Sequence, residues 1–248
     1  MNKTIYTFDG TFFGYLSVVF ECFREKNFEC QIQEKDFIQE SFLFEYIHIE
    51  TDIQKAQRVV TGIKNKISET VFENVYMAFL SNQNSRFTDI LKYLKLGFKV
   101  GKNVDDFKSY DFVLNVLKIR RTVGQEAHLL TGFVRFLETK EGVLYAEISP
   151  DNDVVEIVAE HFTDRLKNEK WIINDVKRKK CAVYNEFQLL IMNDIEKLNI
   201  INSENEENWQ SLWKDFFKTI AIENRKNIKL QNNMLPKKFR KHMTEFNE

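Results

Sequence analysis

The chain has 248 residues, of which 43% are hydrophobic and 29% are charged, and its formal net charge at pH 7 is −1. This composition is typical of a folded globular protein, and two prolines and eight glycines argue against long flexible linkers. No run reaches the ~18 apolar residues of a membrane span and the N-terminus lacks the apolar core of a signal peptide, so we expect a soluble, cytoplasmic protein without a membrane partner.

The first half of the chain predicts helices and two short strands. Residues 4–8 and 43–50 are rich in the β-branched and aromatic residues that favour strands. Asp9-Gly10-Thr11 and Thr51-Asp52 supply the turn and cap chemistry that starts a helix. Apolar residues at helical spacing predict helices after both of these caps, and further helices at roughly 70–81, 85–96 and 109–129.

The pattern changes near Gly132, where strands are expected. The predicted elements are a strand at 133–137, a turn at 139–142, a hairpin partner at 143–148, a helix opened by Ser149-Pro150-Asp151, and strands at about 171–176 and 181–192. We therefore predict an α+β fold, with a helical layer in the N-terminal half and a small, mostly antiparallel sheet with a crossing helix in the C-terminal half. The whole chain is expected to form a single unit, divisible into sub-domains 1–125, mainly helical, and 126–248, of α+β type.

The last helical pattern begins at Ser203-Glu204-Asn205-Glu206, which fits a capping box. Behind it, one stripe of the helix carries Trp209, Leu212, Trp213, Phe216 and Ile220. This spacing favours a helix face packed in the core, and stacking of the aromatic residues on nucleic-acid bases is the alternative. Pro236 is expected to start a short final helix.

The three cysteines and four histidines show no metal-ligand spacing. The odd number of cysteines and the absence of a CxxC pair argue against a disulfide framework and against a thiolate metal site. No phosphate-binding loop, dinucleotide fingerprint, nucleophile elbow or radical-SAM cysteine triplet occurs. The sequence therefore predicts no metal and no cofactor in this chain.

Two basic clusters contrast with the nearly neutral total charge. They are Lys177-Arg178-Lys179-Lys180, and the group Arg225, Lys226, Lys229, Lys237, Lys238, Arg240 and Lys241. Lysine-rich turns are often simply hydrated, but two clusters with aromatic residues nearby are typical of a surface that binds the nucleic-acid backbone.

Three stretches of the chain resemble the signature of one bacterial family. They are Phe8-Asp9-Gly10-Thr11 with the residues up to Leu16; Glu126-Ala127-His128 through Arg135 and Ser149-Pro150-Asp151 to Trp171-Ile172-Ile173-Asn174-Asp175; and Leu212-Trp213 through Asn224-Arg225 to Leu235-Pro236-Lys237-Lys238. They are similar to a family of DNA-repair or DNA-metabolism proteins, whose C-terminal domain of unknown function also occurs fused to uracil-DNA glycosylase-like proteins. Its members are encoded beside a DNA-repair radical-SAM protein. Lys177-Arg178 stands where the family has paired arginines, and Arg240 and His242 stand where it has aromatic residues.

The resemblance implies a role in DNA repair, with DNA and a radical-SAM protein as partners. An iron–sulfur cluster and S-adenosylmethionine are then expected only in that partner.

Several single residues are candidates for chemistry, each with a structural alternative. His128 could contact a phosphate or move a proton, with Arg121 on the same face of its helix, or it could cap the helix end. His161 has an acidic neighbour that could orient it, or it packs at the edge of the core. Arg135 could bind a phosphate or form an internal salt bridge.

Three hypotheses for the function follow. The first is a DNA-repair accessory protein that binds DNA through the two basic clusters, together with Arg121 and Arg135, and docks on a radical-SAM enzyme. The second is an enzyme that processes damaged DNA bases, glycosylase-like or lyase-like, with Glu126, His128 and His161 in its site. The third is a protein-interaction module without DNA binding. Whether the chain is an enzyme stays open at this point.

Overall fold

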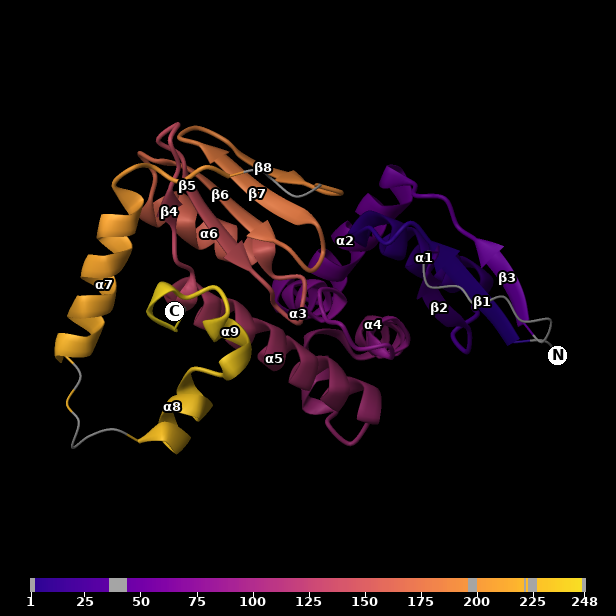
Figure 1. Cartoon of the computed structure of the whole chain (residues 1–248). Helices are drawn as coiled ribbons and strands as arrows, with labels where there is room; N and C mark the ends of the chain where they lie inside the picture. The colour runs from indigo at the N-terminus through magenta and orange to yellow at the C-terminus, as the bar shows by residue number, and fades with distance from the viewer. Residues whose placement is uncertain (1–2, 36–43, 196–199, 221, 223–226, 247–248) are drawn as a thin grey trace. The chain divides into compact units, whose positions relative to one another are not determined.

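The computed structural model describes residues 3–35, 44–195, 200–220, 222 and 227–246 (Figure 1). Its contacts form two compact units, Met1–Gly124 and Gln125–Glu248, which we call the N-terminal unit and the C-terminal unit. Helix α5 (Asp111–Phe133) continues from the first into the second. Both units combine a sheet with helices, so the predicted α+β class is confirmed.

The N-terminal unit contains a parallel sheet with the strand order β2-β1-β3. Its elements are β1 (Lys3–Phe8), α1 (Phe12–Glu25), β2 (Gln31–Glu34) and β3 (Phe44–His48). Helix α1 links β1 to β2 and begins where the Thr11 hydroxyl accepts a hydrogen bond from the Gly14 amide, at 2.9 Å. The sequence did not predict strand β2, because its four mostly polar residues lack the alternating pattern that is typical of a strand.

The remaining elements of the N-terminal unit are helical. They are α2 (Ile53–Lys66), α3 (Glu69–Phe79), α4 (Arg86–Val100), the 3₁₀ helix Gly101–Asp106 and the first part of α5. Their core includes a cluster of aromatic rings in which Phe8 and Tyr15 each lie 5.1 Å from Phe87. The buried Tyr15 hydroxyl donates to the Phe87 carbonyl at 2.8 Å, which satisfies the only polar atom of that side chain.

The C-terminal unit contains a five-stranded sheet with the order β4-β5-β6-β7-β8. Its elements are β4 (Leu137–Glu138), β5 (Leu144–Ile148), α6 (Val155–Arg165), β6 (Lys170–Asp175), β7 (Lys180–Asn185) and β8 (Leu189–Met192). Strands β5 and β6 are parallel and α6 connects them, whereas the other neighbours are antiparallel. The fully buried Trp171 stacks on Tyr184 at 5.2 Å. The expected antiparallel sheet with a crossing helix is therefore confirmed.

The chain then continues into the last helices of this unit. They are α7 (Glu206–Ile220), α8 (Ile228–Met234), α9 (Lys237–Arg240) and the 3₁₀ turn Thr244–Phe246. The Glu206 carboxylate accepts the Glu138 amide of β4 at 2.9 Å, and the rings of Phe217 and Phe246 lie 5.8 Å apart. These contacts attach α7 to the unit along one side only.

The apolar stripe of α7 is largely exposed, so the expectation that it packs in the core is wrong. The exposed fractions are 61% for Trp209, 59% for Leu212, 40% for Trp213, 54% for Phe216 and 55% for Ile220. Helical periodicity shows which residues share a face, but it does not show whether another element covers that face. None of the described helices, α7 included, is both long enough and apolar enough to cross a membrane.

Three predicted element boundaries are also wrong. The strand expected at 133–137 begins only at Leu137, because α5 continues to Phe133 and the Val134 amide still bonds to the Leu130 carbonyl. The strand expected at 181–192 is divided into β7 and β8, because the Asn185 side chain accepts two amides in a turn. The helix expected directly after Asp151 starts only at Val155.

Candidate functional site

Glu126 of α5 fastens the loop between β5 and α6. Its carboxylate accepts hydrogen bonds from the backbone amides of Asp151 and Asn152, at 3.0 and 2.8 Å, and from the Asn152 side chain at 2.7 Å. These bonds fix the loop that precedes α6, and α6 begins at Val155 without a side-chain cap. Glu126 is only 5% exposed.

A fourth donor to Glu126 is Lys238 of α9, whose ammonium lies 2.8 Å from the carboxylate. Burial alone would raise the pKa of Glu126, but the hydrogen bonds from Lys238 and from the two amides outweigh burial and hold the pKa below its usual value. Glu126 is therefore an anion at neutral pH, and its oxygens are occupied.

The turn between β6 and β7 is organised by Asp175, whose side chain is fully buried. It accepts the backbone amides of Lys177 and Arg178 and the Arg178 guanidinium, the last at 3.0 Å. Burial raises the pKa of Asp175, and the hydrogen bond from Arg178 offsets part of that rise. Arg178 also donates to the carbonyls of Pro150 and Asp151, so this turn is joined to the loop held by Glu126.

The two predicted basic clusters meet at Asp151. Its carboxylate accepts a short hydrogen bond from Lys238 and lies 3.6 Å from the ammonium of Lys177. The hydrogen bond from Lys238 lowers the pKa of Asp151, although burial opposes the shift. We call this group the Asp151 cluster. Its members are Glu126, Asp151, Asp175, Lys177, Arg178 and Lys238.

The outward-facing charge of the Asp151 cluster is mostly positive. Glu126 and Asp175 are buried, whereas the side chains of Lys177 and Lys238 are 52% and 41% exposed. Lys179 and Lys237, which adjoin these two lysines in the sequence, are exposed and have no carboxylate partner among the described residues. Asp151, which holds Lys177 and Lys238, is itself 48% exposed, so the surface presents one carboxylate together with four exposed lysines.

The other predicted basic residues do not belong to this surface. Lys180 is 12% exposed and is held by Asp153 and Glu156, at 3.0 and 2.8 Å. Arg135 forms a two-pronged pair with Glu245, at 2.6 and 3.2 Å, so it matches the salt-bridge alternative. Arg240 binds the Asn232 side chain, Lys229 is exposed on α8 and Arg121 is exposed on α5. Arg225 and Lys226 lie outside the described residues.

The three candidates for catalysis are not assembled into one site. Glu126 and His128 are two residues apart on α5, so their side chains point to different sides of the helix, and His128 is exposed. His161 is exposed on α6, and its ring contacts that of Phe162 at 5.1 Å. Among the described residues, no hydrogen bond or ion pair joins either histidine to Glu126. Nor does the described part of the chain contain three side chains of metal-binding type in one group.

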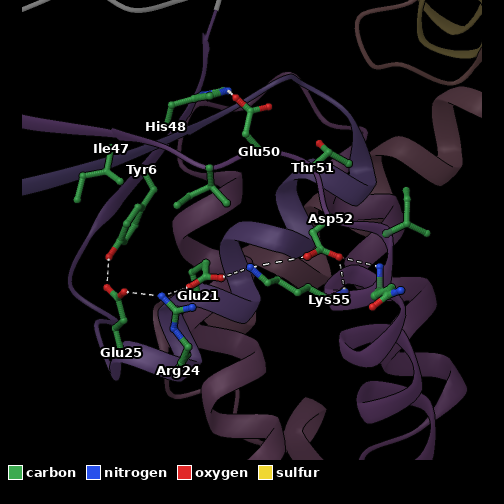
Figure 2. Close-up of a pocket in the computed structure, with 13 residues that line it drawn as sticks. Tyr6, Glu21, Arg24, Glu25, Ile47, His48, Glu50, Thr51, Asp52 and Lys55 are labelled. Carbon is green, nitrogen blue, oxygen red and sulfur yellow. Dashed lines mark hydrogen bonds and ion pairs between the residues drawn. The ribbon is translucent and has the colours of Figure 1, made fainter.

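A cavity of about 750 Å³ in the N-terminal unit was not predicted. Figure 2 shows a series of charged contacts along it that runs through Tyr6, Glu25, Arg24, Glu21, Lys55 and Asp52. Burial and the hydrogen bond to Glu25 raise the pKa of Tyr6 to about 12. These residues come from β1, α1 and the start of α2, and no local sequence pattern connects such distant positions.

A smaller cavity of about 290 Å³ lies in the C-terminal unit. It is lined by Tyr145, Glu147 and His242, among others. His242 contacts the Ser149 hydroxyl at 2.7 Å and lies 3.6 Å from Glu147. Burial lowers the pKa of His242, so its ring is neutral at pH 7. Ser149 is not among the residues that line the cavity, so this contact serves to hold His242 in place.

Comparisons with known proteins place these features in a family. No curated protein and no solved structure matches the chain. The model of the domain of unknown function DUF4130 matches residues 84–245, which is more than half of the chain and includes every member of the Asp151 cluster. The cavity of Figure 2 is lined by residues before this match. The chain belongs to the DUF4130 family.

Proposed function

We propose that the protein is a DNA-repair accessory protein that works with a radical-SAM enzyme and binds the phosphate backbone of DNA through the lysines of the Asp151 cluster and the adjoining Lys179 and Lys237. The observation that supports DNA binding is the meeting of the β6–β7 turn and α9 at Asp151. Sixty residues separate the two lysines that contact this carboxylate, yet they lie on one surface. The proposal for the partner rests on the resemblance described above, and the iron–sulfur cluster and S-adenosylmethionine would belong to that partner.

The chemistry of the surface suits a polyanion. Lysine ammonium groups bind phosphates as point charges, and each phosphate that they neutralise releases a counterion from DNA. Asp151 holds Lys177 and Lys238 in place. Burial opposes the charge on Lys238, but its hydrogen bonds to Asp151 and Glu126 raise its pKa. This arrangement reads no base, so we expect binding that depends on salt and little on sequence.

The test compares two double variants with the same change in charge. Lys179→Ala/Lys237→Ala removes exposed lysines beside the Asp151 cluster without breaking an ion pair, and Lys102→Ala/Lys108→Ala removes exposed lysines of the N-terminal unit. Binding to a fluorescent duplex is followed by anisotropy between ~50 and ~200 mM salt. We expect the slope of log affinity against log salt to fall by about 1.8 in the first variant and to stay unchanged in the second, since each phosphate contact contributes about 0.9.

Two results would count against the proposal. An absence of DNA affinity at ~50 mM salt would favour the protein-interaction module. Equal losses in the two double variants would mean that general charge, and not the surface around Asp151, determines the affinity. A different measurement tests the enzyme hypothesis. Lesion-bearing DNA is incubated with the unmodified protein and with His128→Ala and His161→Ala, two exposed positions at which we expect DNA affinity to stay intact, and is analysed for base loss or strand cleavage. Cleavage by the unmodified protein that these variants lose would favour the enzyme.

A further inference from the structure

Two cysteines of the N-terminal unit lie in contact although no sequence motif pairs them. Cys22 is on α1 and Cys30 directly precedes β2, and their sulfur atoms are 3.5 Å apart. Both are free thiols, with exposed fractions of 0% and 3%. The third cysteine, Cys181, is a buried free thiol in the C-terminal unit and provides an internal comparison.

The geometry leaves a short distance to cover. A disulfide bond is about 2.05 Å long, so the two sulfur atoms must approach by about 1.5 Å. The residues between them can supply this movement, because the helix ends at Glu25 and residues 26–30 have no regular structure. Lys26 is in the left-handed conformation, and the Asn27 amide bonds back to the Cys22 carbonyl, which turns the chain toward β2.

The two thiols are also chemically unequal. The contact with Cys22 lowers the pKa of Cys30 although burial opposes the shift, whereas the contact with Cys30, together with burial, raises the pKa of Cys22. Either sulfur can donate in their mutual contact, and the Cys30 thiol can also donate to the Asn27 carbonyl at 3.5 Å. Cys30 is the sulfur that more readily becomes a thiolate. Burial raises the pKa of Cys181, which makes that thiol a poor nucleophile.

We propose that Cys22 and Cys30 form an oxidation site that reacts with peroxides and closes to an intramolecular disulfide. The Cys30 thiolate attacks one peroxide oxygen, the O–O bond breaks, and the leaving hydroxide takes a proton to become water. The Cys22 sulfur then attacks the sulfenic sulfur of Cys30, forms the S–S bond and releases a second water. The two sulfur atoms together lose two electrons, and hydrogen peroxide accepts them.

The test uses the full chain, first reduced and then treated with hydrogen peroxide. After denaturation, free thiols are alkylated and the protein is digested with trypsin, which cleaves after Arg24 and Lys26 and separates the two cysteines. We expect a linked peptide pair containing Cys22 and Cys30, two hydrogen masses lighter than its parts, that disappears after reduction. Cys181 remains alkylated in the same sample.

Three variants make the result decisive. Cys181→Ser should still yield the linked pair, whereas Cys22→Ser and Cys30→Ser should each abolish it. In Cys22→Ser, we expect Cys30 to oxidise further to the sulfinic acid, because no second thiol traps the sulfenic acid. Alkylation of Cys22 and Cys30 to the same extent as Cys181 after peroxide treatment would overturn the proposal. Disulfides that join Cys22 or Cys30 to Cys181 as often as to each other would also overturn it. DNA binding is measured separately, so its failure would not affect this outcome.

Discussion

Replacement of Glu126 by alanine tests the centre of the Asp151 cluster. The substitution removes the acceptor of two backbone amides, one side-chain amide and the ammonium of Lys238. A buried donor without an acceptor costs roughly 1–3 kcal/mol, and Lys238 is exposed enough to turn partly to water. We therefore expect Glu126→Ala to lower the free energy of unfolding of the C-terminal unit by about 3–5 kcal/mol, mainly because three amide donors lose their acceptor.

The C-terminal unit carries a natural reporter of its own unfolding, because all three tryptophans, Trp171, Trp209 and Trp213, belong to it. Urea unfolding followed by tryptophan fluorescence therefore measures this unit apart from the other. The matched control is Glu160→Ala on α6, which removes an exposed carboxylate and should change the free energy by less than about 0.5 kcal/mol. A loss below 1 kcal/mol in Glu126→Ala would refute the view that this carboxylate organises the cluster.

The pH dependence of the same difference gives a second prediction. The folded protein holds the pKa of Glu126 below its unfolded value of about 4.3, so the stability that this carboxylate contributes is fully present above that value. It is lost as the pH falls through the lower folded-state pKa. The difference in stability between the unmodified protein and Glu126→Ala should therefore be constant from pH 7 to about pH 5 and shrink below about pH 4. A difference that grows on acidification would contradict the assigned direction.

Further substitutions test the exposed helix and the first turn. Leu212→Ser on the exposed face of α7 should lower the free energy of unfolding by less than about 0.5 kcal/mol, whereas Ile173→Ala in the buried face of β6 should lower it by about 2–5 kcal/mol. Both are measured by tryptophan fluorescence, and a large loss in Leu212→Ser would mean that another surface covers this face in solution. Gly14→Ala places a methyl group 2.1 Å from an oxygen of Asp9 and should lower the thermal midpoint measured by circular dichroism, with a cost of about 1–3 kcal/mol. Gly62→Ala, which meets only ordinary contacts inside α2, should leave the midpoint unchanged or raise it, and equal effects of the two glycine substitutions would refute the steric argument.

The starts of α1 and α2 could be predicted because their signals are local. Thr11 and Asp52 accept the amides of residues two or three positions ahead, and such bonds depend only on the residue type and its place at the helix end. The start of α6 could not be predicted in this way. The Asp151 side chain, which was expected to open this helix, binds Lys238 from a distant part of the chain, and α6 has no side-chain cap.

The same distinction explains the candidate site. The sequence shows that Lys177 and Lys238 belong to basic clusters, but their meeting at Asp151 joins positions 26 and 87 residues away from that carboxylate. The role of Glu126 was hidden for the same reason, since its cation comes from α9. The contact between Cys22 and Cys30 depends on the left-handed conformation of Lys26. Lysine rarely adopts this conformation, and no sequence pattern predicts it.

The separation of Glu126 from Lys238 has a consequence for biosynthesis. The ribosome must add 112 further residues after Glu126 before the lysine that neutralises this carboxylate exists. The N-terminal unit can fold during that interval, whereas the nascent C-terminal unit carries an unpaired anion that disfavours burial. Its final packing therefore waits for the last segment to arrive, and a chain cut short before residue 238 should be degraded quickly by cellular proteases.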